Sequence, residues 1–315
     1  MPADQQRKPD QNRASRAAEA WLGSTGPRKA GGPVAILTRR AQQGPMHPLL
    51  AASMIGLLLS PRLVAQEAAA PSRMTAAEVK AKLAAATEQN PPDLTGADLS
   101  GLELDGVDFR RAKLSRVHLV KARLAKANLF TCDLTDAVLT GADLREANLD
   151  GTVLRRANLH EADLEGASLF ATIIERADLS GANLRKARII GYLKGANLAK
   201  AVLREANIGA DPGNQSMGVM RATFVGADLS GADLSSANLY KADFSFASLT
   251  GARLAGADLR TTDLVQTDFS GADITGANFA KADINGAIFR GVVGRAQAKG
   301  FDQARNRDKA IFDAH

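Results

Sequence analysis

A large apolar residue recurs at every fifth position over most of the chain. Leu, Phe or Ile occupies position 94 and every fifth residue to 189, then 193 to 208 in fives, then 224 to 289 in fives. The 38 central positions hold 27 Leu, 6 Phe and 5 Ile, with Ala two residues earlier in 28 repeats and Asp or Asn directly before the centre in 23. A helix would need apolar spacings of three and four, and a strand a spacing of two, so the pattern predicts neither.

A period of five has a geometric solution in which each repeat forms one short extended side and the chain then turns a corner. The centre and the small residue two positions earlier point inward by strand alternation, and the other three residues point outward. Gly often follows two residues after the centre, where a corner can require positive φ. Four such sides would close a coil of twenty residues. Phe224 and Phe244 are twenty apart, as are Phe269 and Phe289, so each pair is expected to stack.

Units such as ADLSGADL, repeated through residues 92–291, resemble the pentapeptide-repeat family, whose unit is A(D/N)LXX. The resemblance implies an all-β fold, a right-handed quadrilateral β-helix. About nine to ten coils would make a rod of roughly 45 Å at a strand spacing of ~4.8 Å. Stacked Leu and Phe side chains in a dry core would stabilise it.

The period is interrupted twice. Ile189 to Leu193 spans four residues, and Ile208 to Phe224 spans sixteen, so that Ile189 to Phe224 still equals seven pentads and the coil phase can be kept. One interpretation is a compressed corner followed by a bulged side at Asp211–Gly218. The other is a projecting loop that meets a partner, because interruptions of a solenoid lie on its surface and often on its binding face.

Two segments lie near the N-terminus. Residues 1–45 are basic, polar and rich in Gly, Pro, Gln and Ala, and they cannot bury enough apolar surface to offset chain entropy, so disorder is expected. Residues 46–70 contain the apolar run Leu49–Leu59, which is too short to span a bilayer. Basic residues precede this run and small residues follow it, an order typical of a secretory signal. We expect an exported, periplasmic protein, with Met46 as an alternative start and a cytoplasmic protein with a buried helix as the other interpretation.

A linker and a short helix are expected within residues 71–91. In residues 75–89, Thr75 and Glu78 form a capping box, and Pro91 forbids continuation. The apolar stripe of this helix consists of Val79, Leu83 and Ala86. We expect the helix to cover the core of the first repeat.

Residues 292–315 are expected to cap the final coil. Arg295–Lys299 predicts a helical turn ended by Gly300. The residues expected to fold over the last coil are Phe301, Ile311 and Phe312. In the drug-resistance branch of the family that the repeats resemble, a C-terminal segment pairs two rods, so a homo-oligomer through this tail is open.

The formal charge of +6 is unevenly distributed, with +6 in residues 1–90, −2 in residues 91–290 and +2 in residues 291–315. The nearly neutral array gives no electrostatic case for nucleic acid. Within it, Arg110–Lys126 and Arg185–Arg204 form two basic belts. A mixed solvated surface is the simpler interpretation, and binding of an acidic partner, such as anionic lipid headgroups or an acidic protein, is the sharper one. The candidate partner-facing residues are Arg116, Arg156, Arg176, Arg185, Lys186 and Lys194, together with Asp211, Asn214 and Gln215 in the long interruption.

Residues with chemical potential are few. Cys132 replaces the small inward Ala, which predicts a buried hydrophobe, and His118 and His160 should lie on one side but two coils apart, too far for one metal. The aspartates of GADLSGADLSSANLYKADF are predicted to accept backbone hydrogen bonds at corners, as Asn does at the same position. A cation on the stacked column of Asp243, Asp263 and Asp283 is the alternative. We expect no enzyme activity, no cofactor and no metal.

These patterns favour an exported, non-enzymatic scaffold with a protein partner of unknown identity. The alternative is a cytoplasmic protein that protects DNA gyrase, as the resemblance to fluoroquinolone-resistance pentapeptide proteins implies. Those proteins imitate duplex DNA with a strongly acidic rod, whereas this array carries −2. An enzyme or metal protein using the Asp columns is a weaker third hypothesis.

Overall fold

The computed structural model describes residues 72–87, 89–210 and 220–313. The predictions for residues 1–45 and 46–70, and those for Asp211, Asn214 and Gln215, lie outside these ranges. Among the described helices, none combines the length and the hydropathy needed to cross a membrane.

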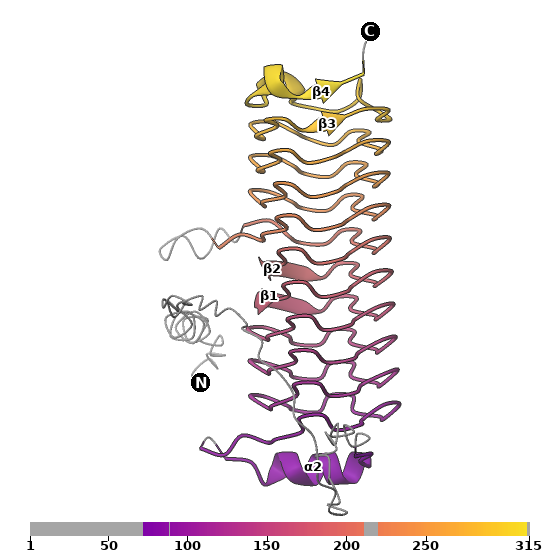
Figure 1. Cartoon of the computed structure of the whole chain (residues 1–315), viewed down its shortest axis with the longest axis vertical. Coiled ribbons are helices and arrows are strands. Elements are labelled where there is room, and N and C mark those ends of the chain that lie inside the picture. Colours follow the sequence, from indigo (N-terminus) through magenta and orange to yellow (C-terminus); the bar gives the residue numbers. More distant parts are fainter. Residues whose placement is uncertain (1–71, 88, 211–219, 314–315) are drawn as a thin grey trace, which may run out of the picture. The chain divides into compact units, whose positions relative to one another are not determined.

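Consecutive coils pair in parallel through the residue directly before each central position. Asp93 bridges Lys113, and Lys113 bridges Asp133 twenty residues later, with the same step at the other positions of the coil. Each regular coil therefore has four sides and twenty residues, as the phenylalanine spacing predicts. Figure 1 shows the coils stacked between α2 (Ala76–Ala84) and β4 (Ile311–Phe312).

The four sides are named here by their first central residues. Side A starts at Leu94, side B at Leu99, side C at Leu104 and side D at Phe109, and each side continues at the paired residues of the following coils. Residues that are neighbours on one side are thus about twenty apart in sequence. Residues five apart lie on different sides.

The core is built from the central residues, and all 38 of their side chains are at most 2 % exposed. The rings of Phe224 and Phe244 stack at 4.6 Å between centroids, and those of Phe269 and Phe289 stack at 4.8 Å, which confirms both predicted pairs. Ala fills most of the other inward positions because the space beside the central residue suits small side chains, and the larger Val117 is also fully buried at such a position.

Where a polar residue takes the small inward position, its side chain bonds to a backbone carbonyl. Cys132 Sγ donates to Phe109 O over 3.1 Å, and Thr152 Oγ1 donates to Leu129 O over 2.8 Å in the next coil. Both side chains are fully buried. The hydrogen bonds offset the cost of placing polar atoms in an apolar core.

Helix α2 begins after Thr75, and the predicted capping box is confirmed. Thr75 Oγ1 accepts from the Glu78 N–H over 3.3 Å, and the Thr75 N–H donates to Glu78 Oε2 over 2.7 Å. The helix ends at Ala84 rather than at residue 89, because Thr87 and Asn90 form a turn with two hydrogen bonds of 3.1 Å. Val79 on the inner face of α2 is fully buried in the core of the coils.

The first interruption shortens one corner between sides D and A. There β1 (Ser168–Ile173) pairs in parallel with β2 (Arg188–Tyr192), and the register shifts between Phe170 and Thr172. Ala171 therefore has no counterpart in β2. Strand β2 has one residue fewer than β1, and Gly191 of β2 pairs with Thr172 of β1.

The second interruption lies at the same corner, one coil further on. Tyr192 on side A bridges Thr223, so the chain passes from Ile208 on side D directly to Phe224 on side A. Phe224 is therefore on the fifth side after Ile189, and the sequence-based count of seven pentads is wrong. After the long interruption the backbone ladder resumes at Thr223, on the side that follows D.

The tail adds a further coil with longer sides. Bridges to the preceding coil occur at Val293, Lys299, Arg305 and Ile311, with a spacing of six. The turn residues with positive φ are Gly294, Gly300 and Asn306. The short helices η2 (Phe301–Gln303) and η3 (Arg307–Lys309) lie between these bridges.

Strand β3 (Ile288–Phe289) pairs in parallel with β4 and closes this end of the core. Phe301 and Phe312 pack against the core, as expected from the sequence. Ile311 is 40 % exposed, so the prediction that it folds over the last coil is wrong. It holds the outward strand position beside the inward Phe312, because successive strand residues point to opposite faces.

Candidate interaction surface

Each basic belt of the sequence becomes a ring around the stack. The seven basic residues of the first belt are distributed over all four sides, because five consecutive residues make one side. Several of them pair with carboxylates nearby, as in Arg110–Asp108 at 2.6 Å and Arg123–Glu103 at 2.9 Å. The mixed solvated surface therefore describes most of this belt.

The second belt divides in the same way. Arg185 and Lys186 are exposed on side C, where Arg185 pairs with Glu205 at 3.2 Å. Lys194 lies on side A, one corner beyond side D. The structure therefore separates Lys194 from Arg185 and Lys186.

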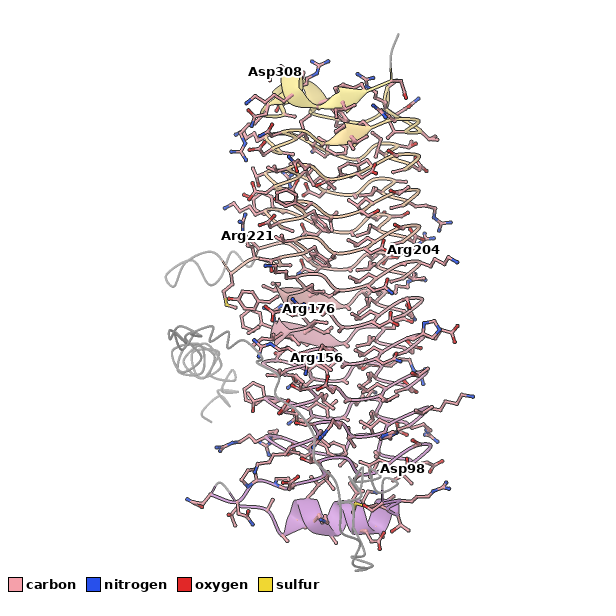
Figure 2. All side chains as sticks on the ribbon, in the orientation of Figure 1. Asp98, Arg156, Arg176, Arg204, Arg221 and Asp308 are labelled. Carbon is pink, nitrogen blue, oxygen red and sulfur yellow. The ribbon has the colours of Figure 1, made fainter. Side chains whose placement is uncertain are left out.

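Side A brings together three of the other candidates in one corner column. Arg116, Asp136, Arg156 and Arg176 follow one another in successive coils, in the order expected from the sequence. Arg156 pairs with Asp136 at 2.6 Å, whereas Arg176 makes no ion pair with a described carboxylate. Figure 2 shows Arg156 and Arg176 above one another on the same part of the surface.

An exposed aromatic residue lies next to this column. The Arg176 N–H donates to Lys194 O over 3.1 Å, so Lys194 lies in the next coil, directly before Gly195, which continues the column above Arg176. Tyr192, two residues before Lys194, is 40 % exposed. We call Arg156, Arg176, Tyr192 and Lys194 the side A patch. Sequence reasoning missed Tyr192, although it stands at the Asp/Asn position of a four-residue repeat.

The side A patch borders the irregular corner. Phe170, Ala171 and Ile190 are buried there in a second apolar cluster outside the core, with Met220 packed against them. The Arg188 guanidinium lies 4.2 Å from the centroid of the Phe170 ring. Outward apolar packing at this corner fixes the backbone that carries Tyr192 and Lys194.

The stacked aspartates of side A are held by arginines. Asp243 bridges Asp263, and Asp263 bridges Asp283, as the sequence predicts. Arg221 reaches Asp243 at 3.3 Å and Asp263 at 2.5 Å, while Arg305 reaches Asp263 at 3.4 Å and Asp283 at 3.8 Å. Guanidinium groups therefore balance the charge that a bound cation would balance. Figure 2 labels Arg221 at the left edge of the stack.

The Asp and Asn side chains directly before the central residues also accept hydrogen bonds at the corners. Asp228, Asp233 and Asp243 each accept a hydrogen bond from the N–H two residues later, over 2.9 to 3.1 Å, and Asn128 and Asn148 do the same. The predicted backbone role is confirmed at these positions. Charge is not required for it, because the amide oxygen of Asn accepts the same bond.

These bonds predict a loss of stability in acid. Hydrogen bonds from the side chain and the N–H of Ser100 lower the pKa of Asp98, and those from Thr275 lower the pKa of Asp273. A carboxyl whose pKa is lower when folded stabilises the fold above its unfolded pKa, and this contribution is lost as pH falls through the folded pKa. We expect the unfolding midpoint to be level near neutral pH and to fall below about pH 4.

Chemical denaturation followed by circular dichroism at a series of pH values would measure this effect. The matched control replaces several corner aspartates by Asn, as in Asp98→Asn and Asp273→Asn, which keeps the acceptor and removes the titration. The unfolding midpoint of the control should fall less steeply as the pH is lowered below about 4. Equal pH dependence in both proteins would contradict the assignment.

One serine–histidine–carboxylate contact occurs on side B. His160 Nδ1 lies 2.9 Å from Ser180 Oγ, and His160 Nε2 lies 3.5 Å from Glu161 Oε1. The His160 side chain is 44 % exposed and the Glu161 side chain 70 % exposed, so water competes for every group that a reaction would need to hold. The arrangement is a surface contact between neighbouring coils.

The part of the chain that the structure describes offers neither a cluster of metal ligands nor a reactive thiol. No group of three or more His, Cys, Asp or Glu side chains there is arranged to hold a metal ion. Burial raises the pKa of the Cys132 thiol to about 12, so the thiolate that would act as nucleophile or ligand is not formed near neutral pH.

The Cys132 thiol is therefore expected to be inert in the folded protein. A chromogenic disulfide reagent at pH 8 should label no thiol in the native chain and one thiol per chain in denaturant, because Cys132 is the only cysteine. Cys132→Thr should fold as the parent does, since Thr152 fills the equivalent position of the next coil with the same type of bond. Rapid labelling of the native chain would contradict the burial.

Comparison with known proteins agrees with the coil geometry. The family model for pentapeptide repeats matches the chain in four stretches, at residues 93–129, 132–169, 220–256 and 252–291. HetL, a pentapeptide repeat protein involved in heterocyst differentiation regulation in the cyanobacterium Nostoc sp. strain PCC 7120, is 31 % identical over 76 % of this chain and 94 % of its own. The chain belongs to the pentapeptide-repeat family. The TM-score to HetL is 0.41.

Other solved structures of the pentapeptide-repeat family also align. QnrB1, a plasmid-mediated fluoroquinolone resistance protein, is 18 % identical over 69 % of this chain and 94 % of its own, with a TM-score of 0.40. A pentapeptide repeat protein from the thylakoid lumen of Arabidopsis thaliana is 36 % identical over 33 % of this chain and 63 % of its own, with a TM-score of 0.20. Among curated proteins, none matches this chain.

Proposed function

We propose that this pentapeptide-repeat protein is a non-enzymatic, exported scaffold that binds a protein partner through the side A patch. Its coil is right-handed with about nine to ten turns, and α2 and the tail cap its ends. The observation that carries the proposal is the position of Arg176, Lys194 and the exposed Tyr192, which lie together beside the corner where the repeat is interrupted twice.

The patch has the composition of a protein contact. Tyr and Arg are enriched at interface hot spots because they combine apolar area with directional hydrogen bonds. Arg176 and Lys194 make no ion pair with a described carboxylate, so a partner carboxylate would not have to displace one. The rigid coil beneath them keeps the loss of side-chain and backbone entropy on binding small.

A photo-crosslinking amino acid at position 192 tests the binding proposal in cells. A discrete adduct is expected, and it should disappear in the Arg176→Glu/Lys194→Glu variant, which reverses both cations at exposed positions. Position 140 on side B is the matched control site and should give no such adduct. Lack of an adduct at 192, or the same adducts at 192 and 140, would overturn the binding proposal.

Export is tested separately. The order of basic, apolar and small residues before the array supports a cleaved signal within residues 46–70. Cell fractionation with mass spectrometry of the N-terminus should find a shortened chain in the periplasmic fraction. A full-length chain confined to the cytoplasm would overturn export and leave the side A patch as a cytoplasmic binding surface.

Gyrase protection is the alternative that these charges oppose. An imitation of DNA would need continuous free carboxylates, whereas Asp136, Asp243 and Asp263 are paired with arginines. The full chain is expected to leave quinolone inhibition of supercoiling by gyrase unchanged. Clear protection in that assay would replace the scaffold proposal by the alternative.

A further inference from the structure

Charge is segregated among the sides of the coils that follow the second interruption. Between residues 220 and 290, sides A, B and C each carry more carboxylates than cations. Side D carries three cations and a single carboxylate, namely Lys241, Arg260, Lys281 and Asp258. The array is nearly neutral in sum, but one of its sides is positive in these coils. The two basic belts of the sequence do not reveal this side, because the cations of side D are about twenty residues apart.

Two of the side D cations lie close to one aromatic ring. The Lys241 Nζ lies 5.2 Å from the centroid of the Tyr240 ring, and the Arg260 guanidinium carbon lies 5.7 Å from it in the next coil. The Lys241 N–H donates to Arg260 O over 3.2 Å, so the two residues belong to adjacent coils at the same corner. Arg260 pairs with Asp258 at 2.7 Å, which holds the guanidinium in place.

The positive run continues upward for two more coils. Lys281 occupies the same corner position as Lys241, with the same φ of 61°. Lys299 is in the coil above, where it bridges Asn278 at the start of side D, three residues before Lys281. Lys241, Lys281 and Lys299 make no ion pair with any described carboxylate. Asp302 in η2 follows Lys299 and ends the run. We call Tyr240, Lys241, Arg260, Lys281 and Lys299 the side D strip.

The neighbouring side limits the width of what can bind. Side A carries the column of Asp243, Asp263 and Asp283 next to the corner that bears Lys241 and Lys281. A plane of anionic headgroups would also meet this column, whose charge Arg221 and Arg305 already balance, and would gain little attraction there. A single narrow chain can follow the strip and avoid the column. This favours a polymer over a membrane surface.

The chemistry of the strip also favours carboxylates over phosphates and bases. Lys241 and Arg260 already lie over the Tyr240 ring, and this competes with the base stacking on which binding of single-stranded nucleic acid relies. Four cations are also fewer than the roughly six to ten phosphate contacts of a typical DNA-binding protein.

We propose that the side D strip binds an extended acidic polypeptide segment that lies along the stack. One cation per coil at a coil spacing of ~4.8 Å spans about 15 Å, which matches about five residues of extended chain at ~3.3 Å per residue. Glutamate or aspartate side chains at alternate positions would face the strip. The proposal adds a second contact to the scaffold and does not depend on the side A patch.

The test uses the full chain and a fluorescein-labelled peptide of about five residues with Glu at alternate positions, matched in length to the strip. Fluorescence polarisation should show saturable binding that weakens as salt is raised. The variant Lys241→Glu/Lys281→Glu/Lys299→Glu should bind at least about tenfold more weakly, because three cations become anions. Glu fits these sites, since Glu146 and Glu161 occupy equivalent corners at φ 55° and Glu103 stands at the bridge position of Lys299.

The control variant Lys80→Glu/Lys121→Glu/Lys200→Glu makes the same change in net charge at exposed positions away from side D, two of them at corners with φ of 54° and 59°. It should bind the peptide within about twofold of the parent. Equal loss in both variants, or lack of saturable binding by the parent, would overturn the proposal. The proposal would also be overturned if anionic vesicles or a single-stranded oligonucleotide bound the parent more tightly than the peptide does, and if only the side D variant lost that binding. The Arg176→Glu/Lys194→Glu variant should bind the peptide normally, so failure of this proposal is distinguishable from failure of the scaffold proposal.

Discussion

Replacing Gly191 by Ala should destabilise the middle of the stack by about 3 kcal/mol, although a methyl group is the only addition. A Cβ at this position would lie 2.4 Å from Thr172 O and 3.1 Å from Thr172 N, both backbone atoms of β1. The contact cannot be relieved by moving a side chain. Strand β2 would have to move away from β1, which breaks the pairing at the shortened corner. Hydrogen exchange of the β1 and β2 amides, together with the thermal unfolding midpoint, measures the effect.

Gly271→Ala is the matched control for this prediction. A methyl group added at Gly271 would meet no other atom within 4 Å, but the φ of +69° is in the left-handed region. The substitution should cost about 1 kcal/mol, the ordinary penalty for an L-residue there. A smaller loss for Gly191→Ala than for Gly271→Ala would contradict the close approach of the two strands.

Phe289→Ala should release the tail and cost about 3–5 kcal/mol, the usual range for an aromatic residue removed from a core. The Phe289 ring stacks on Phe269 at 4.8 Å and on Phe312 at 5.5 Å, with Phe301 at 5.2 Å. Truncation therefore removes the one side chain that links the last regular coil to both aromatic residues of the tail. The Ile311 amide, which donates to Ala287 O over 2.8 Å, should lose its protection from hydrogen exchange.

Phe246→Ala provides the control, because Phe246 is 58 % exposed at a corner of side A. Its removal should change stability by no more than about 0.5 kcal/mol. Because repeat arrays can unfold in parts, local exchange is a better measure here than a single global midpoint. Retained protection at Ile311 in the Phe289→Ala protein would show that the tail is held by other contacts.

The regular part of the fold follows directly from the sequence. A central Leu or Phe every fifth residue and Ala two before it specify which side chains point inward, and the Thr75–Glu78 box specifies the start of α2. The corner role of Asp228 and Asp233 also follows, because the same position elsewhere accepts Asn. In each case the residues in contact are separated by only a few positions in the sequence or by a constant twenty positions.

Features that depend on an irregular backbone did not follow from the sequence. The count of seven pentads between Ile189 and Phe224 requires that all added residues build sides, whereas the bridge between Tyr192 and Thr223 shows that Phe224 is only five sides after Ile189. The six-residue spacing of the tail is visible only through Gly294, Gly300 and Asn306, which are too few to define a period. Tyr192 was missed for the same reason, since a four-residue repeat does not fix which residues face outward.

The twenty-residue register also determines how such a protein can lengthen or shorten. Deleting or duplicating twenty residues within the regular array removes or adds one coil, and every later residue stays on its own side. Inserting five residues instead turns all later sides by a quarter revolution, so that the lysines of side D would face where the aspartates of side A had been. Growth of this scaffold by whole coils therefore preserves its surfaces, and growth by single repeats exchanges them.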